Sequence, residues 1–364
     1  MKKTMRFGAL AAVAALGLAA CGSAPESAPA DQSGESGGTA AETTTDVKAC
    51  MVSDSGGFDD KSFNQSGHDG LMRAKEELGV QVDQAESSSD ADFIPNIENM
   101  VQGGCDIIIG VGFLMADAMD EAAAAYPETK FALVDSGFNA EHDNAKPLLF
   151  NTAEASYLAG YASAAMSTTG KVGTFLGMNL PSTAIFADGY VDGVAKYNEV
   201  HSEAVEVIGW DKAAQDGMAT GNFEDVSKGK QFSEQLIQQG ADVIMPVAGP
   251  VGAGSLAAAK ENAGTMVVWV DADGALTNPD DSSVILTSVM KQISAAVFDA
   301  IQSVVDDSFT SEAYVGTLEN GGVGIAPWHD FEDKVSPELN EELEGLKADI
   351  ISGTIVVESV NTPS

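Results

Sequence analysis

Short apolar runs that alternate with helical patterns constrain the fold of this chain more than any other feature. Six runs rich in valine and isoleucine are predicted strands, at residues 50–53, 107–111, 131–134, 172–176, 243–247 and 267–270. Helical patterns lie between them, for example at 67–78, 115–126, 233–239 and 255–262. Continuous apolar strands separated by helices are typical of parallel sheets that are covered on both faces. The sequence therefore predicts an α/β fold.

The two halves of the chain repeat one plan. Residues 104–108 (GCDII) open a strand–helix–strand unit that ends at Asp135, and residues 240–244 (GADVI) open another that ends at Asp271, with the same spacing from glycine to aspartate. Phe63 and Phe186 also stand at matching distances before an Asp-Gly pair, each at the predicted entry to the first helix of its half. Two matches together favour two copies of one unit, and hence two similar lobes.

Three acidic residues follow predicted strands directly: Asp54, Asp135 and Asp271. In open parallel sheets, ligands bind in the crevice beyond the carboxyl ends of the strands. Two similar lobes that face each other would bring these carboxylates into one cleft, and we place the binding site there.

The first residues predict export and a lipid anchor. A basic cluster at 2–6 precedes an apolar stretch at 7–18 that is too short to span a bilayer, as in a secretory signal, here residues 1–20. The stretch ends in Leu-Ala-Ala-Cys and resembles a bacterial lipobox, in which Cys21 would carry the lipid. The alternative is an ordinary signal with a chance cysteine. Acyl chains on one residue suffice for stable anchoring, so we expect the protein at the outer face of the cell membrane.

The composition then divides the chain. Residues 21–46 are mostly Ser, Ala, Pro, Gly, Glu and Thr and form a predicted flexible tether. The folded part is long enough for two domains. We expect lobe 1 at 47–150 with about 272–305, and lobe 2 at 151–271 with about 306–360.

The net charge of −37 excludes nucleic acid and other polyanions as partners, because so acidic a surface repels them. The four histidines lie on separate segments without metal-ligand spacing, so no metal is predicted. Cys50 and Cys105 each stand near the start of a predicted strand. The exported context permits a disulfide between them, but two buried thiols are equally compatible with the sequence.

Residues 51–65 (MVSDSGGFDDKSFNQ) form the most informative segment. They read as a strand, a glycine-hinged loop and a helix start with Ser62 or Asn64 as the cap. The acidic spacing does not fit an EF-hand calcium loop. Phe63 stands at a polar junction where an aromatic ring can stack on a planar ligand, although a local hydrophobic staple would also explain it.

This segment resembles the basic membrane protein family, which comprises purine-nucleoside-receptor-like binding lipoproteins of ABC transporters. The resemblance covers essentially the whole folded part. It rests also on residues 110–113 (GVGF), 154–161 (EASYLAGY), 169–173 (TGKVG), 188–190 (DGY), 240–244 and 286–291 (LTSVMK). It implies a type I periplasmic-binding-protein fold, with two Rossmann-like lobes that close about a hinge on a nucleoside. A permease and its ATPase are the implied partners, with no cofactor, and we expect a monomer.

The resemblance also implies roles for single residues. Asp54 and Asp135 look like acceptors for the N–H groups of a purine. Phe63 looks like the stacking platform, with Asn64 beside it as a polar contact. Asp271 would accept hydrogen bonds from the ribose hydroxyls, as an acidic residue at a strand end does in dinucleotide folds.

Lys291 would donate to the sugar. The alternatives without a ligand are that Asp271 caps a turn and that Lys291 lies on a solvated helix face. Residues 245–250 (MPVAGP) depart from the family's aromatic followed by Gly-Gly. The second face of the base sandwich is then Met245 or Phe186, and Gly249 of the same stretch is also expected at the ligand.

Three other functions compete with this hypothesis. Residues 252–257 (GAGSLA) mimic a dinucleotide fingerprint, but they lie in the second copy of the repeat, in an exported protein. No serine-hydrolase elbow, zinc-protease motif or Cys-x-x-Cys is present, so we expect no enzyme. A binding protein for a sugar or a signalling molecule would use similar chemistry. A purely structural surface lipoprotein would not need a cleft lined with carboxylates.

Overall fold

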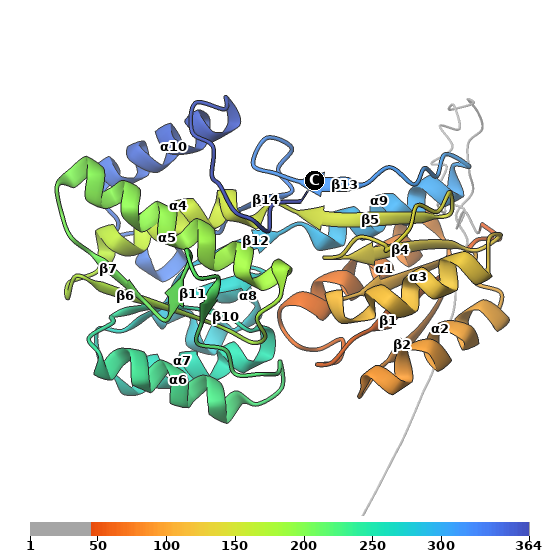
Figure 1. Ribbon diagram of the computed structural model, residues 1–364, viewed down its shortest axis with the longest axis horizontal. Helices are drawn as coiled ribbons and strands as arrows, with labels where there is room; N and C mark the ends of the chain where they lie inside the picture. Colours follow the sequence, from red (N-terminus) through yellow and green to blue (C-terminus); the bar gives the residue numbers. More distant parts are fainter. Residues whose placement is uncertain (1–44, 364) are drawn as a thin grey trace, which may run out of the picture. The chain divides into compact units, whose positions relative to one another are not determined.

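The computed structural model describes residues 45–363 (Figure 1). The predicted signal at 1–20, the lipidation residue Cys21 and all but the last two residues of the predicted tether lie outside the described residues. In the part described, no helix combines the length and apolar character needed to cross a bilayer.

The first lobe is built on a six-stranded sheet in the order β13-β5-β4-β3-β1-β2. Its strands are β1 (Lys48–Ser53), β2 (Gln81–Glu86), β3 (Ile107–Val111), β4 (Lys130–Val134), β5 (Ala145–Phe150) and β13 (Tyr314–Gly316). All neighbouring strands are parallel. Helices cover both faces: α1 (Phe63–Leu78) packs with α9 (Ile293–Val305), and α2 (Phe93–Gln102) packs with α3 (Ala116–Ala125).

The second lobe repeats this arrangement in the order β14-β12-β11-β10-β6-β7. Its strands are β6 (Lys171–Leu176), β7 (Glu206–Ile208), β10 (Val243–Val247), β11 (Met266–Asp271), β12 (Ile285–Lys291) and β14 (Val323–Ile325), the last of them antiparallel. Its helices are α4 (Thr152–Met166), α5 (Pro181–His201), α6 (Val226–Gln238), α7 (Ala253–Glu261), α8 (Gly274–Thr277) and α10 (Pro337–Ile351). A small hairpin, β8 (Trp210–Asp211) and β9 (Asp216–Gly217), follows β7.

The two sheet orders correspond strand by strand, which confirms the α/β fold and the duplicated plan. Asp135 directly follows β4, and Asp271 ends β11, the matching strand of the second sheet. Both residues have left-handed backbones, with φ of 67° and 69°. Aspartate tolerates this conformation better than most residues because its short side chain bonds locally. The repeat therefore extends to the backbone at these two positions.

The lobe boundaries at the C-terminal side differ from those expected. We expected the chain to return to lobe 1 at about residue 272, but β12 pairs with β11, so the return follows Lys291. The final crossing to lobe 2 comes after β13, which pairs with β5, rather than at residue 306. The expectation was wrong because a strand that pairs in one sheet looks the same in sequence as one that pairs in the other.

Cys50 and Cys105 form a disulfide, with 6.0 Å between their Cα atoms. The bond joins β1 to the loop before β3, within an apolar cluster that also contains Phe93, Ile108 and Met119. The structure thus decides between the two states that the sequence left open.

Candidate ligand-binding cavity between the lobes

A cavity lies between the carboxyl ends of the two sheets, with an unfilled volume of about 540 Å³ that is partly continuous with solvent. Loops after β1, β3 and β4 line it from lobe 1, and α5 together with the ends of β10, β11 and β12 lines it from lobe 2. The residues with polar or aromatic side chains are Asp54, Ser55, Asp60, Phe63, Asn64, Phe113, Asp135, Ser182, Thr183, Phe186, Phe223, Asp271 and Lys291.

Lys291, the last residue of β12, joins two of the predicted carboxylates. Its Nζ forms an ion pair with Asp135 and lies 3.2 Å from Oδ1 of Asp271. All three side chains are buried. Burial by itself would lower the pKa of Lys291, but attraction by the two carboxylates raises it above its usual value. The lysine is therefore a fixed cation, and not a residue on a solvated helix face.

Asp54 occupies a different part of the cavity, at the end of β1. Its Oδ1 accepts a long hydrogen bond of 3.4 Å from Nδ2 of Asn64, which also donates to the carbonyl of Ser55 at 3.0 Å. No lysine, arginine or histidine pairs with Asp54 in the described residues. Burial raises its pKa well above the ordinary value, against a lowering contribution from Asn64. The Oδ1 of Asn64 is itself buried and lacks a partner within residues 45–363. These acceptors can take hydrogen bonds from a ligand that carries N–H or O–H donors.

Gly112 allows Asp54 to occupy this position. A Cβ atom at Gly112 would overlap the Asp54 carboxylate. The backbone φ of Gly112 is 125°, a conformation that residues other than glycine rarely adopt. The sequence argument did not identify this glycine as a site residue, although it lies in the GVGF motif.

Asp60 holds the start of α1. Its Oδ2 accepts from the amide of Asn64 at 2.9 Å, and its Oδ1 accepts from the amides of Ser62 and Gln65 at 2.9 and 3.0 Å. The Ser62 side chain occupies the N-cap position but makes no cap hydrogen bond there. Burial raises the pKa of Asp60, and the three amide hydrogen bonds lower it by a smaller amount, so that the net pKa is about 6. We expected Ser62 or Asn64 as the cap, and the structure gives that role to Asp60.

Three aromatic rings, including that of Phe150, lie around Lys291. Its Nζ is 4.8 Å from the centroid of the Phe63 ring and 5.1 Å from that of Phe186. The first ring comes from the start of α1 in lobe 1. The second comes from the second turn of α5 in lobe 2, five residues inside the helix.

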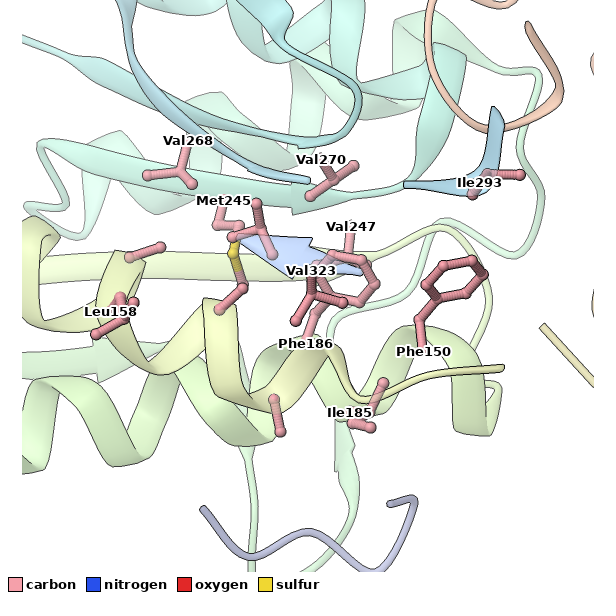
Figure 2. Close-up of a cluster of buried hydrophobic side chains, with 14 of the residues drawn as sticks. Phe150, Leu158, Ile185, Phe186, Met245, Val247, Val268, Val270, Ile293 and Val323 are labelled. Atoms are coloured by element: carbon pink, nitrogen blue, oxygen red, sulfur yellow. The ribbon is translucent and has the colours of Figure 1, made fainter. Parts of the chain in front are cut away.

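Met245 does not belong to the cavity wall, contrary to our expectation. Its side chain is fully buried near Leu158 and Val268 in the core of lobe 2 (Figure 2). Met245 lies two residues before the end of β10, so its side chain packs under α4 and α5 instead of reaching the open edge of the sheet. Gly249, which follows this strand, does line the cavity.

Sequence reasoning missed several residues of the wall. Asp60 lies inside the segment that we singled out, and its spacing before the helix could have identified it as a cap. Phe113 lies in the GVGF motif, in the short 3₁₀ helix after β3 (Phe113–Met115). Phe223 lies in an irregular loop without any pattern that marks it, and only the fold brings it to the cavity.

The glycines of the apparent dinucleotide fingerprint have a packing role. A side chain at Gly252 would meet the ring of Trp269, and one at Gly254 would collide with the backbone of α6. They allow α7 to lie close against its neighbours. Within residues 45–363, no group of three or more His, Cys, Asp or Glu side chains is arranged to hold a metal ion.

Comparison with known proteins identifies the family. Residues 47–361 match the family described as "ABC transporter substrate-binding protein PnrA-like". The chain belongs to this family. PnrA-like proteins are the substrate-binding components of ABC transporters and not enzymes.

Two relatives of known name align with most of this chain. The "ABC transporter nucleoside-binding protein BmpA" of Lactococcus lactis subsp. cremoris is 31% identical over 98% of this chain and 99% of its own length. "Basic membrane protein A" of Borreliella burgdorferi is 29% identical, over 86% of this chain and 88% of its own length.

Solved structures agree with the fold. A solute-binding protein of an ABC transporter system from Aeropyrum pernix K1 has a TM-score of 0.77 and 29% identity, with coverage of 85% of this chain and 92% of that one. A periplasmic solute-binding protein of Actinobacillus succinogenes, solved with D-allose, has a TM-score of 0.60 at 12% identity over 79% and 99% of the two chains, and shows the fold alone. The type I periplasmic-binding-protein fold, expected from the resemblance, is thus confirmed.

Proposed function

We propose that this protein binds a purine nucleoside in the interlobe cavity and delivers it to the permease of an ABC transporter. We also propose that it is held at the outer face of the membrane by a lipid on Cys21. The observation that carries the nucleoside proposal is the division of the cavity into two polar parts, one at Asp54 and Asn64 and one at Lys291, with rings from both lobes beside Lys291.

The base end is proposed at Asp54 and Asn64. Asp54 is buried, and within residues 45–363 it has no basic partner and the side-chain oxygen of Asn64 has no hydrogen-bond donor. An unpartnered buried acceptor costs free energy. A base edge with N–H donors would restore the missing hydrogen bonds, so donor-rich purines such as hypoxanthine and guanine suit this end.

The sugar end is proposed at Asp271 and Lys291. Their ion pair combines acceptors and donors in a space of a few ångström, which suits the adjacent hydroxyls of ribose. Asp135 shares Lys291 with Asp271. We therefore assign Asp135 to the junction of base and sugar, where it can serve the base contact expected from the sequence.

The flat face of the base would be held by aromatic stacking. Phe63 and Phe186 come from opposite lobes and both lie near Lys291. Stacking of a base on an aromatic side chain contributes roughly 1–3 kcal/mol. A nucleoside that fills the space between lobes would thereby favour the closed arrangement, which is what a hinge-type binding protein requires.

The relatives support both parts of the proposal. The Lactococcus lactis relative, which aligns over nearly the full length of both chains, is named a nucleoside-binding protein. A protein of Pyrococcus abyssi, 32% identical over 79% of this chain and 71% of its own length, is named a lipoprotein. That name agrees with the lipobox around Cys21.

Calorimetric titration with inosine, guanosine, adenosine, cytidine and ribose tests the ligand class. We expect saturable heat with the purine nucleosides and little with ribose. Binding of ribose but of no nucleoside would refute the proposal. Asp271→Ala should weaken nucleoside binding roughly 10- to 100-fold, as expected for lost hydrogen bonds to a charged group. It should weaken free-base binding much less, and equal losses would contradict the sugar role.

The anchor has its own test. Replacement of Cys21 by serine should prevent acylation and release the exported protein from the membrane fraction. Retention of the variant in that fraction would show that attachment does not depend on the thiol.

A further inference from the structure

Ser62 has a hydroxyl that its own helix does not use. A serine at the N-cap normally accepts a hydrogen bond from an amide in the first turn. In α1, Asp60 accepts from these amides instead, at 2.9 Å from Asn64 and 3.0 Å from Gln65. The same carboxylate also accepts from the amide of Ser62 at 2.9 Å. The serine backbone is thus fixed while its side chain is available for another partner.

That partner lies in the other lobe. The Ser62 hydroxyl lies 3.0 Å from Oδ2 of Asp271 and 3.2 Å from the carbonyl oxygen of Val270, and it shares its proton between these acceptors. Ser62 is fully buried, and Asp271 follows it by 209 residues. Ser62 does not line the cavity, so its effect on a ligand passes through Asp271.

The bond completes the setting of the Asp271 carboxylate. Its Oδ1 is held by Lys291 at 3.2 Å and its Oδ2 by Ser62, and its backbone has φ of 69°. Lys291 belongs to the same lobe as Asp271 and stays with it when the lobes separate. Ser62 belongs to lobe 1 and would be withdrawn.

We propose that Ser62 is a positioning residue that couples closure of the lobes to the orientation of Asp271. Only in the closed arrangement are both carboxylate oxygens of Asp271 fixed, so Asp271 takes its binding orientation only when the lobes close. In return, the cross-lobe bond must break before the lobes part, which slows ligand release. The ligand part of this inference rests on the nucleoside proposal above, whereas the cross-lobe bond does not.

The test compares two serines of the same segment. Ser62→Ala removes the cross-lobe donor. Ser66→Ala is the matched control, because the Ser66 hydroxyl donates within α1 to the carbonyl of Ser62 at 2.6 Å. A hydrogen bond to a charged group that exists only in the closed state should change the release rate by roughly tenfold. We expect stopped-flow measurements with inosine and guanosine to show release about ten times faster from Ser62→Ala, with little change in the association rate.

Several outcomes would overturn the inference. Equal release rates in the wild type and both variants would do so, as would equal acceleration in both variants, since Ser66 does not reach lobe 2. Ser62→Gly also lacks the hydroxyl and suits an N-cap, so it should reproduce the acceleration if the alanine variant folds poorly.

Failure of the nucleoside proposal is recognised separately, as absence of binding to the wild-type protein. In that case small-angle X-ray scattering of the purified proteins without ligand still decides the cross-lobe role. We expect a larger radius of gyration for Ser62→Ala than for the wild type and Ser66→Ala, and identical values would overturn it.

Discussion

Replacement of Lys291 by methionine should destabilise the protein strongly, because it leaves two buried carboxylates without their cation. Lys291 is only 5% exposed, and its Nζ pairs with both Asp135 and Asp271. Methionine is of similar length and apolar, so the packing changes little. Removal of one partner from a buried ion pair typically costs about 3–5 kcal/mol. We expect a loss of this size in the free energy of unfolding at pH 8.

The loss should depend on pH in a defined direction. Burial already raises the pKa of Asp135 above its ordinary value, and loss of the lysine raises it further. A carboxyl with a raised pKa in the folded state binds more protons there than in the unfolded chain. The free-energy cost of burying the charged carboxylate is therefore complete above the pKa of the folded state. It disappears as the pH falls toward the pKa of the unfolded chain, near 4. The deficit of Lys291→Met should be smaller at pH 5 than at pH 8.

Urea unfolding of wild type and variant at pH 5, 7 and 8 measures this deficit. Lys260→Met is the control, because Lys260 lies at the surface, 2.6 Å from Asp281, and exposed pairs contribute little. Asp135→Asn in the Lys291→Met background should recover part of the loss, since asparagine is neutral and tolerates the left-handed backbone. The reasoning is refuted if Lys291→Met loses no more stability than Lys260→Met, or if its deficit grows on acidification.

Three further predictions concern the cavity and its frame. Gly112→Ala should cost ~3 kcal/mol and weaken binding, because its Cβ would overlap the Asp54 carboxylate; urea unfolding should show no such loss for Gly137→Ala, where no atom lies within 4 Å. Replacement of both Cys50 and Cys105 by alanine should lower the free energy of unfolding by ~4 kcal/mol, as expected for a cross-link between residues 55 apart, and no change would contradict that estimate. Asp60 has a pKa raised to about 6 in the folded protein, so burial of its charged form costs stability at neutral pH. This cost falls as the pH drops below 6 and the carboxyl is protonated. Acidification from pH 7 to 5 should stabilise the wild type relative to Asp60→Asn by ~1 kcal/mol, and parallel pH profiles would be the contrary result.

Much of the fold follows from local patterns in the sequence. The predicted strands at 107–111 and 243–247 coincide with β3 and β10, because continuous apolar runs have one stable environment, the middle of a covered sheet. The edge strand β2 was missed, since its residues are mostly polar and none of them is buried. The equal spacing of Asp135 and Asp271 also predicted that they lie at matching strand ends, which the topology confirms.

The sequence by itself determined the alternation of strands and helices, the duplicated lobes and the strand ends at which acidic residues gather, because these depend on residues close together in the chain. Tertiary structure alone decided where the chain crosses between lobes, that Lys291 lies between Asp135 and Asp271, and that Met245 is buried in the core. It also decided that the Ser62 hydroxyl donates to Asp271. Such contacts join residues that are far apart in sequence, and no local pattern records which of many possible partners the packing of two sheets will bring together.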